Sequence, residues 1–577
     1  MIARAKDVAV ESPAQPEREQ PRNPQASRET VESIVIAIVL AFLFRGFIAE
    51  AFVIPTGSMA PTLQGRHMDV SCPQCGFQYR TGASSENPDS PVKYEVQQTT
   101  CPLCRYTMEL QKRSHPNQRS FTGDRILVSK FSYLFNEPKR WDVIVFKYPG
   151  NAKQNYIKRL VGLPGESLLI QGGDVYTLPS SAGSGDAEGR IARKPPEKVT
   201  AMLQLVHDTK YVSPELQAVG WPSRWQGASV SAGEPGWQAV APDQSWSVAA
   251  TANDAWLRYH HVIPWPEDWS HIARGERPPR LDSYEGQLIT DYYEYNDSDT
   301  RAEDAPGLYW VGDLAVECDV DVKQAVGELL LDLVEGGTHF TCRIALDTGR
   351  ATLAMQGGAG VFVTESNSPA AQRTAQTPLR EAGSYRLQFA NVDNQILLWV
   401  DGKLIPFDGP ATYDAPRNLT PHWSEQDPGD LAPIGVGARQ AQLQVNRLRV
   451  LRDVYYVAVE ADRREREYSG FAYAYAIQQI MASPREWSRT TLFESRRSVR
   501  FDLAPDQFFP MGDNSPQSKD ARLWSGGSRL TGYRDPPPYV DRKLLIGKAV
   551  LIYWPHPWRG PFGIPLIPNL SRMGLIH

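Results

Sequence analysis

Short segments rich in β-branched and aromatic residues recur along most of this chain, and glycine and proline separate them. Three early examples are Gly123–Phe131, Trp141–Pro149 and Tyr156–Glu166. No long helical patterns alternate with these segments, so the sequence lacks the βαβ rhythm of a parallel α/β fold. We therefore predict a mainly β protein built from antiparallel sheets.

Strand signals also recur at turn-punctuated intervals from about 281 to 455, which predicts a β-sandwich. The segment Ser384–Leu404, a hairpin with an Asp-Gly turn, resembles the laminin-G or concanavalin-like sandwich family. That resemblance implies a glycan or protein ligand, and a purely structural spacer is the alternative. Residues 171–280, rich in Ser, Gly, Pro and Trp, are predicted to be irregular. The predicted sandwich strands are Leu308–Val316, Glu328–Val334, Phe340–Leu346, Tyr385–Phe389, Gln395–Val400 and Leu443–Leu451.

One apolar run, Ser33–Phe44, continues past Arg45 as far as Ile54. Its uninterrupted part is shorter than the roughly 20 residues that a spanning helix needs. Arg45 can extend its charge toward the bilayer surface, so we predict a transmembrane anchor over residues 31–50. The preceding residues 1–30 are rich in Pro, Gln, Glu and Arg, which is typical of a disordered tail. We expect that tail to be cytoplasmic.

The charge of the chain excludes one class of partner. The formal net charge is -5 and the isoelectric point is about 6.1. The basic residues are mixed with acidic ones and form no long tract, so we expect no nucleic-acid partner.

Four of the six cysteines form two CxxC pairs, Cys72 with Cys75 and Cys101 with Cys104. This spacing is typical of a tetrahedral thiolate site for a structural zinc ion, inside a zinc-ribbon-like insert over 69–108. Four thiolates leave no open position for a substrate, so the zinc would play no part in catalysis. In an oxidising compartment, two disulfides are the alternative. Cys318 and Cys342 lie in strand-like runs, either paired across a sheet or buried as thiols.

Ser58 follows the apolar run in the string Phe52–Leu63 and is a candidate nucleophile. None of the ten histidines lies inside the strand motifs that accompany it, so lysine is the better candidate for its base. A lysine acts as a base only when desolvation lowers its pKa, which requires an apolar surface. Lys158 meets this condition, because Tyr156 and Leu160 share its face of a strand. The competing lysines are Lys130 and Lys147.

Five motifs in order resemble type I bacterial signal peptidase. They are the apolar run, Ile54–Leu63, Gly123–Val128, Tyr156–Gly165 and the loop Met511–Arg522. The resemblance covers about 31–63, 121–170 and 495–560. It implies a signal-peptidase-like β fold on the outer face of the bacterial cytoplasmic membrane, which cleaves signal peptides from exported preproteins. Membrane lipid would be a further partner, and no cofactor would be needed for catalysis.

The resemblance also implies roles for individual residues. Ser58 would be the nucleophile and Lys158 the general base. Thr56 would help to bind the oxyanion, and Ser518 would orient the lysine. Ser515 and Ala521 depart from the family loop, which puts its rigidity in doubt. The charged residues that would support the loop are Asp513, Arg159, Asp520 and Arg522.

Two other functions are weighed against this one. A catalytically weak scaffold could bind envelope glycans or proteins through the sandwich. A self-cleaving regulator would need a DNA-binding domain where this chain has its apolar run. The expected organisation is a tail at 1–30, an anchor at 31–50, a catalytic core at 51–170 and 456–577, and inserts at 171–280 and 281–455.

Overall fold

A computed structural model describes most of the chain, and it divides into two compact units, Met1–Glu50 and Ala51–His577. The predicted tail at 1–30 lies mostly outside the described residues. The described ranges are 24–43, 49–87, 94–178, 189–227, 236–299, 307–357, 360–363, 369–460, 467–471, 473–526, 535–559 and 565–577.

The first unit contains the helix α1 (Pro24–Leu43). The side chains of Val31, Ile34 and Ile36 on this helix are 53–59% exposed. Among the helices that the structure describes, none has both the length and the apolar character needed to cross a membrane. The transmembrane anchor predicted over 31–50 is therefore not supported, and residues 44–48 of that prediction lie outside the described ranges.

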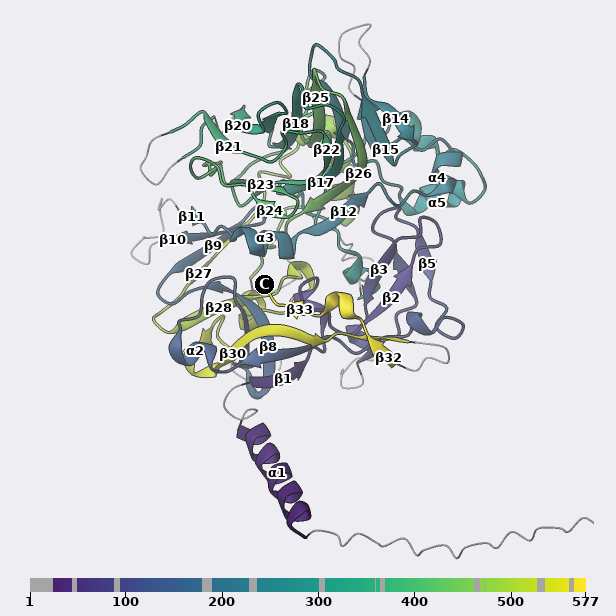
Figure 1. The fold of residues 1–577 in the computed structure, drawn as a ribbon. Helices are drawn as coiled ribbons and strands as arrows, with labels where there is room; N and C mark the ends of the chain where they lie inside the picture. The colour runs from purple at the N-terminus through teal and green to yellow at the C-terminus, as the bar shows by residue number, and fades with distance from the viewer. Residues whose placement is uncertain are drawn as a thin grey trace, which may run out of the picture. The chain divides into compact units, whose positions relative to one another are not determined.

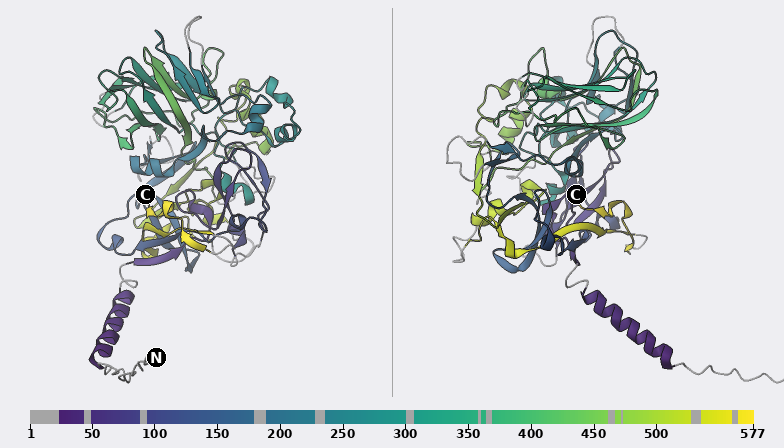
Figure 2. Two further views of the ribbon diagram at one scale, coloured as in Figure 1. Left: turned by 45° about the vertical axis from the view of Figure 1, so that its right-hand side comes forward. Right: turned by 60° about the vertical axis from the view of Figure 1, so that its left-hand side comes forward.

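The second unit is mainly β, as predicted, and three larger sheets carry most of it (Figures 1 and 2). One sheet has the order β1–β6–β30–β7–β8–β28–β29, with β33 paired to β30. It joins early segments of the chain to late ones, because β30 lies between β6 and β7. Its strands are β1 (Ala49–Val53), β6 (Arg125–Ser129), β7 (Val143–Tyr148), β8 (Asn151–Gly162), β28 (Gln507–Met511), β29 (Val540–Asp541), β30 (Leu545–Trp554) and β33 (Gly574–Leu575).

A smaller sheet adjoins this core and has the order β11–β10–β9–β27. Its buried residues, among them Leu168, Ile170 and Phe501, join one hydrophobic cluster with Ile144 and Leu160 of the core sheet. The two sheets therefore share a core. The strands are β9 (Ser167–Gln171), β10 (Asp174–Leu178), β11 (Arg190–Ile191) and β27 (Ser498–Asp502).

The other two larger sheets face each other as a β-sandwich between residues 204 and 452. Alternate residues of β17 and β19 are buried, as expected where one face of each strand packs on a partner sheet. One sheet contains β12 (Gln204–Asp208), β14 (Gln238–Ala241), β15 (Ser245–Val248), β17 (Leu314–Val322), β22 (Gly383–Val392), β23 (Gln395–Val400), β24 (Lys403–Leu404) and β26 (Leu443–Arg452). The other contains β13 (Trp225–Gly227), β16 (Ala255–Tyr259), β18 (Glu328–Glu335), β19 (Thr338–Ala345), β20 (Arg350–Gln356), β21 (Gln372–Gln376) and β25 (Ile434–Arg439).

The sandwich differs from the sequence expectation in two ways. Segment 171–280, which we expected to be irregular, supplies β12 to β16. The strand expected at Leu308–Val316 forms later, as β17, because Leu308 to Val311 are buried in a separate cluster with Tyr455 and Trp487. Cys318 and Cys342 are free thiols buried in the sandwich core on different sheets.

Short hairpins and helices complete the unit. The hairpins pair β2 (His67–Ser71) with β3 (Gln78–Gly82), β4 (Gln98–Thr100) with β5 (Thr107–Glu109), and β31 (Pro557–Arg559) with β32 (Pro565–Pro568). The α-helices are α2 (Ser132–Phe135), α3 (Pro196–Met202), α4 (Pro214–Ala218), α5 (Pro266–Ile272), α6 (Ala474–Met481) and α7 (Pro484–Trp487).

Candidate active site

Ser58 lies in a single 3-10 turn, η2 (Gly57–Met59), beyond the end of β1. Met59 and the following Ala60 are fully buried, whereas Ser58 is only half-buried. The chain before the turn is fixed to the core sheet, because the Ile54 N–H donates to the Asp124 carbonyl at 2.9 Å. The serine is therefore held on a rigid turn with its side chain partly open to solvent.

Lys158 lies on β8 and reaches the serine directly. Its Nζ donates to Ser58 Oγ at 2.6 Å and to the Ile157 carbonyl at 3.0 Å. On the neighbouring strand β7, Ile144 is the register partner of Lys158. The lysine is only 4% exposed. The structure thus brings together two residues that are 100 positions apart in the sequence.

The surroundings of Lys158 favour its neutral form. Burial lowers the pKa of Lys158 from 10.5 to about 8, while Asp520 and Asp513 act in the opposite direction and Arg522 adds to the lowering. No carboxylate hydrogen-bonds to this lysine among the described residues, so the cost of desolvating the ammonium dominates. At mildly alkaline pH the amine can accept a proton from the serine hydroxyl.

Two buried ion pairs hold the loop after β28. Arg159 binds Asp513 through two hydrogen bonds of 2.6 and 2.7 Å, and both side chains are inaccessible to solvent. Arg522 binds Asp520 through two hydrogen bonds of 2.8 Å, also without solvent access. A charge-assisted pair with two parallel bonds fixes geometry as well as distance. All four charged residues singled out in the sequence therefore lie in this loop or next to it.

The loop departs from the family pattern without losing its contacts. Ser515 is 3% exposed, and its hydroxyl accepts hydrogen bonds from Arg522 and from the Val457 N–H, both at 2.9 Å. Ala521 is fully buried. Both positions are therefore buried, and Ser515 is hydrogen-bonded within the loop.

Ser518 and Thr56 both lie near Ser58. Ser518 is fully buried, and a Cβ added to Gly512 would lie 2.2 Å from its Oγ and 2.3 Å from the Ser58 carbonyl oxygen. Within the described part of the chain, Ser518 makes no hydrogen bond to Lys158, so its predicted orienting role stays a prediction. Thr56 is exposed and lines the same cavity as Ser58.

The cavity beside the dyad has a volume of about 320 Å³. The core sheet and its adjoining loops supply only part of its wall, including Thr56, Ser58 and Lys158. The rest comes from regions outside the family pattern. These contributors are Gly82 and Ser84, from the cysteine-rich insert, and Tyr295 and Asn296, from the segment between the sandwich strands β16 and β17.

Sequence analysis missed two polar residues that hydrogen-bond to the turn carrying Ser58, and a third that contacts one of them. Asn514 donates from Nδ2 to the Gly57 carbonyl at 3.1 Å, and its backbone N–H donates to the Ser58 carbonyl at 3.2 Å. Ser84 Oγ accepts from the Gly57 N–H at 3.1 Å. Asn296 pairs with Asn514. Asn514 lies within the quoted loop motif, whereas no local signal marks Ser84 or Asn296.

The four clustered cysteines meet in space. The Sγ atoms of Cys72 and Cys104 are 3.5 Å apart, and those of Cys75 and Cys101 are 3.6 Å apart. All four are buried free thiols, and their sulfur atoms lie within 4.8 Å of one another. Sulfur ligands at about 2.3 Å from a tetrahedral zinc ion would be separated by similar distances. The residues fit a metal site, and the structure forms neither of the two alternative disulfides.

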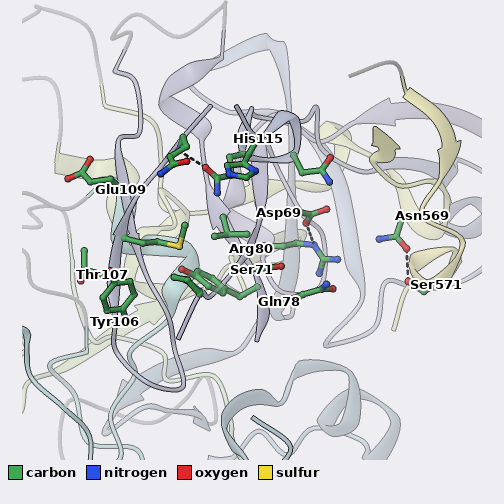
Figure 3. A pocket seen from close by; sticks show the side chains of 17 residues that line it. Asp69, Ser71, Gln78, Arg80, Tyr106, Thr107, Glu109, His115, Asn569 and Ser571 are labelled. Atoms are coloured by element: carbon green, nitrogen blue, oxygen red, sulfur yellow. Dashed lines mark hydrogen bonds and ion pairs between the residues drawn. The ribbon is translucent and has the colours of Figure 1, made fainter. Parts of the chain in front are cut away.

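A second, larger cavity of about 950 Å³ lies beside the hairpins β2–β3 and β4–β5 (Figure 3). Asp69 and Arg80 line it and form an ion pair at 3.3 Å. Asn569 and Ser571 close another part of it, with the Ser571 hydroxyl donating to Asn569 at 2.5 Å. No residue singled out in the sequence for catalysis lines this cavity.

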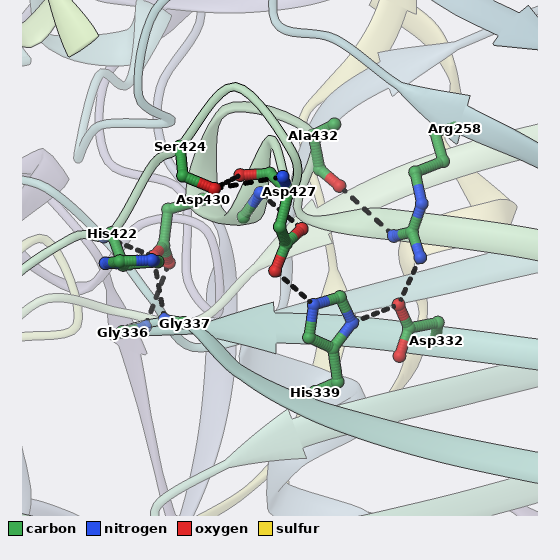
Figure 4. A network of polar contacts seen from close by, with 11 residues as sticks. Arg258, Asp332, Gly336, Gly337, His339, His422, Ser424, Asp427, Asp430 and Ala432 are labelled. Atoms are coloured by element: carbon green, nitrogen blue, oxygen red, sulfur yellow. Dashed lines mark hydrogen bonds and ion pairs between the residues drawn. The ribbon is translucent and has the colours of Figure 1, made fainter. Parts of the chain in front are cut away.

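A polar network occupies one part of the sandwich (Figure 4). The His339 ring contacts Asp332 at 2.8 Å and Asp427 at 3.0 Å, and Arg258 also binds Asp332. The hydrogen bonds to Asp332 and Asp427 raise the pKa of His339 to about 9. This histidine is therefore protonated at neutral pH and forms ion pairs with both carboxylates.

Comparison with known proteins supports a peptidase enzyme. A family model described as "Signal peptidase, peptidase S26" matches residues 27–72, 109–202 and 434–554. Signal peptidase I of Leptolyngbya laminosa is 29% identical over 170 residues, which cover 28% of this chain and 56% of that protein. Probable signal peptidase I-1 of Synechocystis is 26% identical over 159 residues, 26% of this chain and 52% of its own. The chain thus spans about half the length of these curated relatives.

Local identity is higher in one segment. Signal peptidase I of Pseudomonas fluorescens is 48% identical over 56 residues, which cover 8% of this chain and 20% of that protein. Solved structures also show a distant likeness. A carbohydrate-binding module of Bacillus subtilis covers 40% of this chain and 93% of its own length, at 9% identity and a TM-score of 0.19. A likeness this low assigns no ligand to the sandwich.

Proposed function

We propose that this protein is a serine endopeptidase that cleaves signal peptides from exported preproteins with a Ser58/Lys158 dyad. The observation that carries the proposal is the 2.6 Å contact between Lys158 Nζ and Ser58 Oγ, made by a lysine whose pKa is lowered to about 8. The family match and the names of the relatives support the substrate class.

The contact between Lys158 and Ser58 supports an acyl-transfer cycle in which the lysine acts first as base and then as acid. Neutral Lys158 takes the hydroxyl proton as Ser58 Oγ attacks the scissile carbonyl carbon. The C–N bond then breaks, Lys158 gives the proton to the leaving amine, and an acyl ester on Ser58 forms. Water attacks that ester after losing a proton to Lys158, which returns the proton to Ser58 Oγ as the new carboxyl end departs. The Ser58 N–H and the Thr56 hydroxyl would bind the oxyanion.

Substitution of either dyad residue tests this function. Processing of a preprotein should fall by at least about 1,000-fold in Ser58→Ala and Lys158→Met, because each change removes a group that forms or breaks a bond. Gel analysis of the mature product measures it. Undiminished cleavage by either variant would exclude the dyad.

We place the proposed activity at the bacterial cytoplasmic membrane, with the catalytic domain on the outer, periplasmic face. The exposed apolar side chains of α1 support a lipid contact. After cell fractionation, we expect the protein in the membrane pellet and, in spheroplasts, accessible to added protease. A protein found in the supernatant would contradict this location.

We further propose that Cys72, Cys75, Cys101 and Cys104 hold a structural zinc ion. Their sulfur positions fit one tetrahedral ion, and the chemistry at Ser58 involves none of them. Metal analysis of the purified protein should find about one zinc per chain, and Cys101→Ser should lower that content. Absence of zinc together with two disulfides would contradict the assignment.

A further inference from the structure

A segment of the insert at 281–455 reaches the turn that carries Ser58. This segment includes η6 (Glu294–Asp299) and is tied at its base to the sandwich. Arg452 of β26 donates to the carbonyls of Asp291 and Tyr292, both at 3.0 Å. The chain is therefore anchored to the sandwich four residues before Asn296.

Tyr295 shows how closely the segment fits. A Cβ added to Gly57 would lie 2.2 Å from the Tyr295 ring, and one added to Gly82 would lie 2.7 Å from it. Two glycines from separate parts of the chain thus leave the space that this ring occupies. The Tyr295 hydroxyl also donates to the Arg66 carbonyl at 3.1 Å.

Asn296 makes the polar contact that matters most. Its side-chain amide forms two reciprocal hydrogen bonds with the amide of Asn514, both of 2.7 Å. The two residues are 5% and 2% exposed. A buried pair that satisfies a donor and an acceptor on each partner fixes the orientation of both amides.

Asn514 passes this orientation to the nucleophile turn. Its Nδ2 donates to the carbonyl of Gly57, which also accepts from the Ala60 N–H within the turn and belongs to the same planar peptide group as the Ser58 N–H. Fixing the Gly57 oxygen therefore fixes the direction of the Ser58 N–H. The preceding peptide group is held by Ser84, which accepts from the Gly57 N–H.

We propose that Asn296 is a positioning residue for catalysis. Through Asn514, it holds the Gly57–Ser58 peptide so that the Ser58 N–H is directed at the developing oxyanion. The insert at 281–455 thus contributes a residue that positions the catalytic turn. This inference rests on the proposed peptidase function.

Replacement of Asn296 by leucine tests the inference, because leucine has a similar volume and makes no hydrogen bond. Loss of one oxyanion donor costs about 100- to 1,000-fold in kcat, and a misdirected donor should cost less. We expect kcat for cleavage of a signal-peptide substrate to fall by about 10- to 100-fold, while KM stays within about twofold. A purely structural role would not separate kcat from KM in this way.

Asn391→Leu is the matched control. Asn391 is a buried asparagine of the sandwich, 1% exposed, that hydrogen-bonds to Tyr413 and Glu335. We expect this variant to lose stability but keep its kcat. Wild-type protein that does not cleave would refute the proposed function itself. Cleavage by wild type with an equal kcat in Asn296→Leu, or an equal loss of kcat in Asn391→Leu, would refute the inference alone.

Discussion

Lys158 in the core sheet and Lys194 at the boundary with the sandwich are both buried, at 4% and 3% exposure. Burial lowers the pKa of Lys158 to about 8. Burial also acts to lower the pKa of Lys194, but Asp393 and Asp453 outweigh it and raise that pKa well above its usual value. The difference lies in direct contact, because the Lys194 ammonium touches the two carboxylates at 2.6 and 2.7 Å. Burial alone therefore does not make a lysine a base.

The largest expected effect on stability comes from breaking the Lys194 cluster. Lys194→Met leaves Asp393 and Asp453 buried without their cation, which should destabilise the fold by about 3–5 kcal/mol at pH 7. Chemical denaturation measures this. Burial raises the pKa of Asp393 and Lys194 counteracts it, so without the lysine this carboxyl takes up a proton more readily when folded and the variant should regain stability as the pH falls. A stability equal to that of wild type would contradict the role of this ion pair.

Lys158→Met should have the opposite effect on stability. The folded pKa of about 8, against 10.5 for the free side chain, corresponds to about 3 kcal/mol of unfavourable burial at pH 7. The variant should be more stable than wild type by up to that amount at pH 7. The difference should shrink as the pH rises from about 8 to 10.5, where the wild-type lysine loses its proton in both states. A less stable variant at pH 7 would show that Lys158 is not desolvated.

The rate of cleavage should follow the same pKa. Because the base must be neutral, kcat/KM should rise about tenfold per pH unit below pH 8 and level off above it. Initial rates over pH 6 to 10 measure the profile. A kcat/KM that keeps rising about tenfold per pH unit up to pH 10 would indicate an ordinary, solvated lysine and would remove the contrast with Lys194.

The smallest expected effect concerns His339, where carboxylates raise a pKa as they do at Lys194. Its pKa of about 9 lies above the ordinary 6.5, so its stabilising contribution is complete below pH 6.5 and is lost as the pH rises through 9. Since the side chain is partly exposed, His339→Gln should cost only about 1–2 kcal/mol at pH 6. The two proteins should converge in stability at pH 10. At each pH, the kcat of the variant should equal that of wild type. A difference that persists at pH 10 would rule out the titration.

Several features of the site are readable from local sequence. Strand periodicity places Lys158 on an apolar face, and the spacing of Cys72, Cys75, Cys101 and Cys104 indicates one cluster, because both depend on residues close together in the chain. The strand at Leu308–Val316 was misplaced for the converse reason. An apolar run does not reveal which hydrophobic cluster will bury it.

The sequence by itself determined the mainly β class, the candidate dyad and the resemblance to signal peptidase, since these follow from short motifs and residue periodicity. Only the tertiary structure decided that Lys158 is buried with no carboxylate of a described residue in contact, whereas Lys194 contacts two carboxylates. It also decided that Asn296 meets Asn514 across 218 positions and that two inserts complete the cavity at Ser58. Such contacts depend on how separate sheets pack together, and no local pattern encodes that packing.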